Sequence, residues 1–122
     1  MHIALTSRER GFIRGAADAS KRVTPVCTGA LLLRAAGLLE GRRATTHWVA
    51  RKELADLGGV TIEDARYVHD GNVIAAVGVS SGSDMALYGV GQLTSTGDAK
   101  RVRKAMEYEP EPPYAGVPLP GA

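Results

Sequence analysis

The residue best suited to chemistry in this sequence is its only cysteine. Cys27 follows the β-branched stretch of residues 23–26 and precedes Gly29 and a run of apolar residues. This order predicts a short strand that turns sharply into a helix, a device that holds a nucleophile clear of a sheet. A thiol at the start of a helix lies near the positive end of the helix dipole, which favours the reactive thiolate. The alternative for Cys27 is a small buried hydrophobic residue.

Two further residues extend this reading. Thr28 comes directly after the thiol, so its backbone N–H would point to where an oxyanion forms, and its side chain could donate to a substrate or cap the helix. His47 ends the stretch Ala44-Thr45-Thr46-His47. If that stretch is a strand beside residues 23–26, His47 and Cys27 open on the same rim of the sheet. The alternative for His47 is a surface or supporting histidine.

The elements that must position these residues follow from periodicity and turn chemistry. Helices are predicted over residues 7–19, with Ser7 as N-cap, and over 28–36, 48–57, 84–93 and from 97 or 98 to 106. Strands are predicted over residues 23–26, 43–47, 65–68 and 73–77, the last two joined as a hairpin by Asp70-Gly71-Asn72. Residues 78–82 are expected to form a flexible loop, with Ser83 capping the helix that follows. Alternation of strands and helices predicts an α/β fold with a largely parallel sheet.

Size and composition narrow the functional classes. With 122 residues the chain is expected to be a single domain, residues 1–122, ending in a proline-rich tail over 109–122. The net charge of +2 is too small to imply nucleic acid, and the cluster Lys100, Arg101, Arg103 and Lys104 is expected to be a solvated helix face. We expect no membrane span, no metal and no cofactor, because there is no long apolar run and the three histidines are scattered. A lone cysteine and the lack of a secretory signal favour the cytoplasm.

Several motifs resemble those of the ThiJ/PfpI superfamily, within the class I glutamine-amidotransferase-like fold. They are Val-Cys-Thr-Gly-Ala-Leu-Leu-Leu at 26–33, the block at 35–48 that contains Ala-Thr-Thr-His-Trp, and Gly-Val-Ser-Ser-Gly-Ser-Asp-Met-Ala-Leu at 78–87. The ending Ala105-Met106-Glu107-Tyr108, followed by prolines, is similar to one branch, which contains isonitrile hydratases and the sensor domains of some AraC-type regulators.

The resemblance implies a flavodoxin-like three-layer sandwich, a homodimer and a small-molecule substrate. It implies that Cys27 is the nucleophile, that Thr28 is its neighbour on the oxyanion side, and that His47 matches a histidine near the thiol. Other branches have histidine directly after the cysteine, so Thr28 argues against a peptidase-like pair.

The resemblance also implies more chain before the cysteine than this sequence has. Relatives carry there the first strands, a carboxylate that bonds the thiol, and a Gly-Gly turn for the oxyanion hole. Here Glu9 and Asp18 are the only acids before Cys27, and both lie on a predicted helix. We therefore expect a sheet that is incomplete at the N-terminus. The edge of residues 23–26 and the apolar faces of Leu31–Leu33 should be open, causing poor solubility or pairing with another chain.

The function implied is isonitrile hydratase-like cysteine chemistry. The alternatives are a ligand-sensing domain related to AraC-type regulators, or a remnant without catalytic activity.

Overall fold

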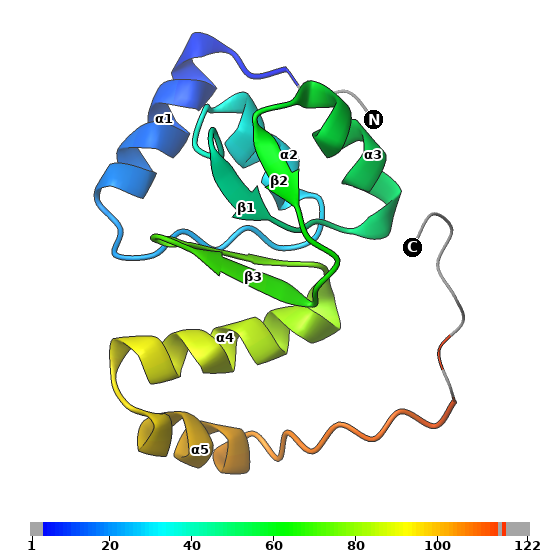
Figure 1. Ribbon diagram of the computed structural model, residues 1–122. Helices are drawn as coiled ribbons and strands as arrows, with labels where there is room; N and C mark the ends of the chain where they lie inside the picture. The colour runs from blue at the N-terminus through cyan, green and yellow to red at the C-terminus, as the bar shows by residue number, and fades with distance from the viewer. Residues whose placement is uncertain (1–3, 115, 117–122) are drawn as a thin grey trace.

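The computed structural model describes residues 4–114 and 116. Its elements are α1 Ser7–Asp18, α2 Gly29–Ala35, β1 Arg42–Ala44, α3 Trp48–Leu57, β2 Val60–Ile62, β3 Tyr67–Asp70, β4 Val73–Ala76, α4 Val79–Leu93 and α5 Thr96–Ala105. Helices and strands alternate through much of the chain, which confirms the α/β class (Figure 1).

The strands form two small sheets. β1 pairs in parallel with β2, with Arg42 opposite Val60, and β3 pairs antiparallel with β4, with Tyr67 opposite Ala76. The segment of residues 23–26 joins β4 through parallel bridges at Val23 and Val26. Most strand neighbours therefore run in parallel, and the hairpin of β3 and β4 supplies the antiparallel part.

The predicted strand over residues 23–26 is reduced to these two bridges. The carbonyl of Pro25 accepts from the Ala76 N–H at 2.9 Å, but proline has no N–H to donate in return. On the other side of this segment, the N–H groups of Thr24 and Val26 have no recorded acceptor among the described residues, and both residues are exposed. The segment is thus bonded to β4 along one edge and open along the other.

Several elements differ from the prediction. The strand predicted over residues 43–47 is β1, which ends at Ala44 and pairs with β2 rather than with residues 23–26, and the strand predicted over 65–68 is β3, Tyr67–Asp70. Strand β2 was not predicted, because it is only three residues long and directly follows the glycines that end α3. Helix α4 begins at Val79, so the predicted loop over residues 78–82 and the predicted cap at Ser83 are wrong. The Gly78 N–H donates to the Ser81 hydroxyl at 3.2 Å within the first turn of α4, and Gly82 lies beside the Val26 side chain. The helix therefore begins within a stretch whose composition is typical of a loop.

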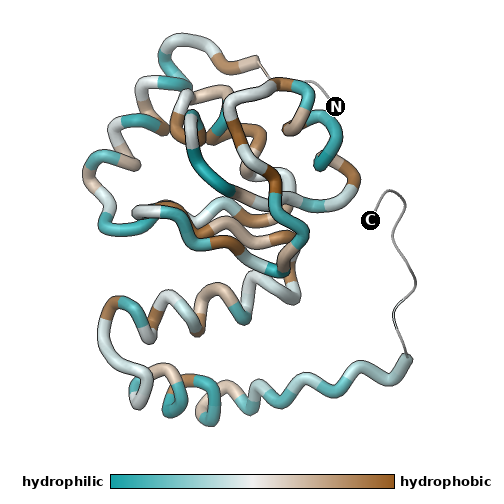
Figure 2. Tube along the Cα trace, in the orientation of Figure 1, coloured by the Kyte–Doolittle hydropathy of each residue, from teal (hydrophilic) through white to brown (hydrophobic). Residues whose placement is uncertain are grey.

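The main core lies between α2, α3, β1 and β4. It contains the aliphatic residues Ala30, Leu31, Leu33, Leu39, Ala44, Ala50, Leu54, Val73 and Ala75. The expectation that the Leu31–Leu33 face is open is therefore wrong for Leu31 and Leu33, which are 2% and 8% exposed, and holds only for Leu32 at 40%. Figure 2 shows apolar segments concentrated in this part of the molecule, whereas α5 and the segment after it are mostly hydrophilic.

The outer helices contribute little buried surface. α1 begins with a capping box, in which Thr6 rather than Ser7 is the N-cap and bonds reciprocally with Glu9, and it has no buried residue. α5 also has no buried residue and lies beside α4 (Figure 1). After α5, residues 108–114 contain no helix or strand. Of the tail predicted over residues 109–122, residues 115 and 117–122 lie outside the described range. Within the described residues, no helix has the length and apolarity of a membrane span.

Candidate functional site

Cys27 lies at a sharply turned point of the backbone, between residues 23–26 and α2. Its φ is 59°, a left-handed conformation that costs an L-residue about 1–2 kcal/mol. Its N–H donates to the Ala76 carbonyl at 3.0 Å. Its carbonyl accepts from the Thr46 hydroxyl at 2.6 Å and from the His47 N–H at 3.4 Å. Thr46 is fully buried, so this bond holds the turn from inside the core.

Thr28 connects this turn to α2. Its side chain makes no capping hydrogen bond, so the predicted capping role is wrong. The next N–H, that of Gly29, is used by the Val26 carbonyl at 3.0 Å. For the Thr28 N–H itself, no acceptor is recorded in the part of the chain that the structure describes. This donor is therefore available at the turn that carries the thiol.

His47 caps the start of α3. Its Nδ1 accepts from the Val49 N–H at 3.2 Å. The neutral ring must therefore carry its proton on Nε2, which the helix does not use. The ring lies near that of Trp48, with centroids 5.6 Å apart. Because the helix cap fixes Nδ1, the imidazole can act on another molecule only through Nε2.

Cys27 and His47 line one cavity of about 560 Å³. Trp48 and residues from the end of β4 and the start of α4 complete its wall, namely Val77, Gly78, Val79, Ser80, Ser81 and Ser83. The structure thus brings together two of the three predicted site residues, while the Thr28 side chain is not among those lining the cavity. In the described chain, no aspartate or glutamate lines it.

The serines of this wall were not predicted as site residues. The Ser81 hydroxyl is occupied by the Gly78 N–H, whereas the hydroxyls of Ser80 and Ser83 have no recorded partner among the described residues. The serine- and glycine-rich composition of this stretch could have indicated residues of the site. It was interpreted as a loop, so the helix that places these serines beside Cys27 was not predicted.

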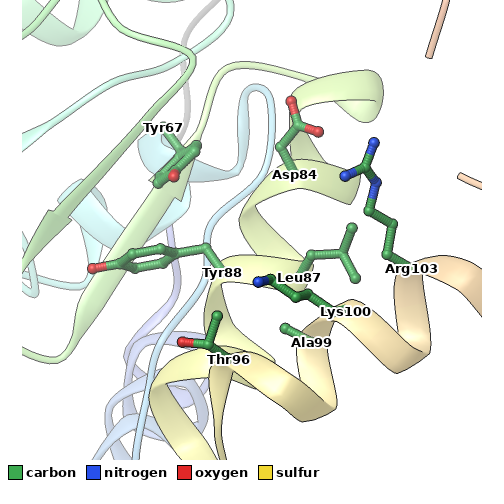
Figure 3. Close-up of a pocket in the computed structure, with 8 residues that line it drawn as sticks. All are labelled: Tyr67, Asp84, Leu87, Tyr88, Thr96, Ala99, Lys100 and Arg103. Atoms are coloured by element: carbon green, nitrogen blue, oxygen red, sulfur yellow. The ribbon is translucent and has the colours of Figure 1, made fainter. Parts of the chain in front are cut away.

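A smaller cavity of about 240 Å³ lies between β3, α4 and α5 (Figure 3). Its lining residues are Tyr67, Asp84, Leu87, Tyr88, Thr96, Ala99, Lys100 and Arg103. Two of its polar groups are engaged, since Asp84 pairs with Arg66 at 2.7 Å and the Tyr88 hydroxyl bonds His69 Nδ1 at 2.6 Å. It holds no thiol, so the cavity at Cys27 is the stronger candidate. Among the described residues, no cluster of three or more potential metal ligands is found.

Comparisons by sequence and by structure agree on the kind of protein that this chain resembles. The sequence profile of the DJ-1/PfpI family matches residues 2–91. An isonitrile hydratase from Pseudomonas putida is 45% identical over 103 residues, which are 84% of this chain and 45% of that protein. A THiJ/PfpI family protein from Pseudomonas syringae has a similar structure, with a TM-score of 0.82, 38% identity, and coverage of 89% of this chain and 45% of that one.

A more distant structural relative is an AraC family transcriptional regulator from Pseudomonas putida. It has a TM-score of 0.72 at 20% identity, covering 87% of this chain and 58% of that one, which shows a shared fold. The chain spans about half the length of these relatives.

Proposed function

The chain belongs to the DJ-1/PfpI family, and we propose that it carries the thiol site of an isonitrile hydratase-like enzyme. The observation that supports this most is the left-handed turn at Cys27, which faces the same cavity as His47. The 45% identity to an isonitrile hydratase suggests the substrate class.

The proposed reaction converts an isonitrile and water to an N-substituted formamide. The Cys27 thiol gives up its proton and the thiolate attacks the terminal isonitrile carbon. A C–S bond forms, and that carbon takes up the released proton to give a thioimidate. Water then adds to the same carbon, one of its protons passes to nitrogen, the C–S bond breaks, and the other proton regenerates the thiol as the formamide leaves. Splitting the hydration into two steps is the usual advantage of a covalent nucleophile.

The neighbours of Cys27 have distinct proposed roles. The free Thr28 N–H would stabilise negative charge that develops next to the reacting carbon. His47 would donate a hydrogen bond from its Nε2–H to the reacting substrate or water, because the helix cap occupies the lone pair of Nδ1. The family resemblance also implies a carboxylate beside the thiol. Since no acid lines the cavity within the described residues, we propose that another segment or a second polypeptide supplies it.

We further propose that the chain associates with another copy or another polypeptide. The open edge at Thr24 and Val26 supports this, because unpaired strand edges readily accept another chain. The exposure of Phe12, at 78%, also supports it. A molar mass by light scattering that rises with concentration is expected, and a strictly monomeric chain would contradict it. A cytoplasmic location remains our proposal, consistent with a single unpaired cysteine.

The test is formamide production from a simple isonitrile, followed by mass spectrometry. We expect Cys27→Ser to abolish product formation. Unchanged turnover in this variant would refute the nucleophile role. His47→Asn is the companion variant, since asparagine is a good N-cap but lacks an imidazole. We expect it to lower kcat by about 10²–10³ if the Nε2–H bonds the reacting atoms, with little loss of α3 stability.

The second candidate function is ligand binding without turnover, as in a sensor. The observation that favours it is the absence of an acid among the described residues that line the Cys27 cavity. Calorimetry with an isonitrile distinguishes the two. Binding without formamide indicates a sensor, formamide production indicates the enzyme, and neither result indicates a remnant without this function.

A further inference from the structure

The cavity at Cys27 has a neighbour that the family-level reaction does not explain. A second cavity of about 600 Å³ is lined by Arg66, Ser80, Tyr108, Pro110, Glu111 and Pro112. Ser80 also lines the Cys27 cavity, so the two meet at the first turn of α4. We call the second cavity the tail compartment, because four of its six lining residues come from the segment after α5.

Specific bonds hold this segment in place. The Tyr108 hydroxyl donates to Asp84 Oδ1 at 2.5 Å, and the other Asp84 oxygen pairs with Arg66 at 2.7 Å. Arg103 adds a bond from Nε to the Tyr108 carbonyl and an ion pair with Glu109, both at 3.0 Å. Charge-assisted bonds are stronger than neutral ones, so Tyr108 is anchored to both α4 and α5, and Glu109 to α5. The wall made by Pro110 to Pro112 follows directly from this anchor.

The lining of the tail compartment indicates what it can bind. The Tyr108 ring and the two prolines present apolar surface. The charge of Arg66 is already matched by Asp84, whereas Glu111 has no recorded partner among the described residues. The compartment therefore suits a largely apolar group that ends in a cation or a hydrogen-bond donor.

We propose that the tail compartment binds the N-substituent of the substrate while the reacting carbon lies at Cys27. The substrates would then be isonitriles with an extended aryl or alkyl substituent that ends in an amine or another donor, not isonitriles of methyl size. The substrate class rests on the proposed function, whereas the adjacency of the two cavities rests on the shared Ser80 and on the bonds of Tyr108.

The test uses maleimides, which report on the cavities whether or not the chain hydrates isonitriles. The Cys27 thiol adds across the maleimide double bond, forming a C–S bond while the thiol proton ends on the neighbouring carbon. Intact-mass spectrometry gives the rate constants for N-benzylmaleimide and N-methylmaleimide. We expect their ratio to exceed that measured for free cysteine, because the benzyl group can lie in the tail compartment.

Two variants decide the role of the tail. Tyr108→Phe removes the hydroxyl that bonds Asp84, and we expect the benzyl-to-methyl ratio to fall about three- to tenfold, as for loss of one hydrogen bond. Tyr114→Phe is the matched control, since Tyr114 is exposed and not part of either cavity, and should leave the ratio unchanged. An identical ratio in all three proteins would overturn the proposal.

A charge pair tests the end of the substituent. We expect wild type to favour N-(2-aminoethyl)maleimide over N-ethylmaleimide more strongly than Glu111→Gln does. Asp18→Asn removes one negative charge from the exposed face of α1 and is the charge-matched control. Equal preferences in Glu111→Gln and wild type would overturn the predicted cationic end. Isonitrile turnover is measured separately, so absent turnover with a maleimide ratio that depends on Tyr108 would refute the reaction and retain the compartment.

Discussion

The two cavities that meet at Ser80 are built from different kinds of structure. The Cys27 cavity lies against the core, where β4 is entirely buried and the buried Thr46 hydroxyl bonds the Cys27 carbonyl. The tail compartment is made mainly of exposed residues, held by the bonds around Asp84. The difference teaches that the reacting thiol is fixed by the packing that stabilises the fold. The proposed specificity surface, by contrast, can change without disturbing that packing.

The energetic basis of the contrast lies at Cys27. A left-handed cysteine persists only where surrounding contacts outweigh its strain of about 1–3 kcal/mol. Three hydrogen bonds to its backbone come from β4 and from the residues before α3. The tail compartment has no comparable strain at its lining residues, and its one nearby left-handed residue, Glu107, lies just before the anchor at Tyr108. Variants in the two regions should therefore differ in size and kind of effect.

The largest expected effect comes from the core behind Cys27. Leu54 is fully buried in α3, and Leu54→Ala should lower the free energy of unfolding by about 2–5 kcal/mol through lost contacts and a cavity. Leu57→Ala, on the same helix but half exposed, is the control and should cost about 0.5 kcal/mol or less. Urea denaturation followed by circular dichroism measures both. Equal losses would show that α3 is not packed as the structure has it.

The next effect separates two adjacent threonines. Thr45 and Thr46 are both fully buried, but only Thr46 makes a side-chain hydrogen bond, whereas the Thr45 hydroxyl has no partner among the described residues. We expect Thr46→Val to destabilise the chain by about 1–2 kcal/mol, because the Cys27 carbonyl loses its shorter bond. Thr45→Val should be neutral or stabilise by about 1 kcal/mol, since it removes an unsatisfied buried hydroxyl.

The same pair gives a second readout at the thiol. If the Thr46 bond holds the turn, Thr46→Val should change the rate at which Cys27 reacts with N-methylmaleimide under folding conditions, and Thr45→Val should not. If Thr46→Val and Thr45→Val change stability and thiol reactivity to the same extent, Thr46 contributes only general core packing.

Local chemistry explains which elements could be predicted from the sequence. Helix α3 has the predicted bounds of residues 48–57, because a capping side chain precedes it and glycine ends it. The hairpin of β3 and β4 is confirmed because Gly71 supplies a positive φ at its turn. The start of α4 was missed because the serine- and glycine-rich residues 78–82 are typical of a loop, whereas the structure has a helix from Val79.

The site, like the fold, has some features that could be predicted from the sequence and others that could not. The turn at Cys27 could be anticipated, since it lies where a strand-like segment meets a helix. His47 does line the same cavity, but by another route than predicted, because β1 ends at Ala44 and the residues after it bond the Cys27 carbonyl without forming a strand. The bond from Thr46 could not, because nothing local distinguishes it from Thr45. The tail compartment could not be predicted from the sequence either. It brings Ser80 together with residues 108–112, and hydrophobic periodicity does not indicate such contacts between distant parts of the chain.

A smaller effect is expected at the anchor of the tail. Asp84→Asn removes the charge that pairs with Arg66 and weakens the bond from Tyr108. Because the Arg66 side chain is largely exposed, the loss of stability should stay below about 1 kcal/mol. The benzyl-to-methyl maleimide ratio should nevertheless fall as it does in Tyr108→Phe. A loss of stability as large as that of Leu54→Ala would remove the contrast between core and tail.

The smallest effect is a pH dependence of the tail. The hydrogen bond to Asp84 raises the pKa of Tyr108 above its ordinary range, because the neutral phenol is the donor. A raised pKa means that the stabilisation is fully present below the ordinary tyrosine pKa of about 10 and is lost as the pH rises through the higher folded value. An absorbance titration of phenolate should therefore show one tyrosine ionising late in wild type and earlier in Asp84→Asn. The maleimide ratio should fall over the same alkaline range. A titration that Asp84→Asn leaves unchanged would show that this bond does not anchor the tail in solution.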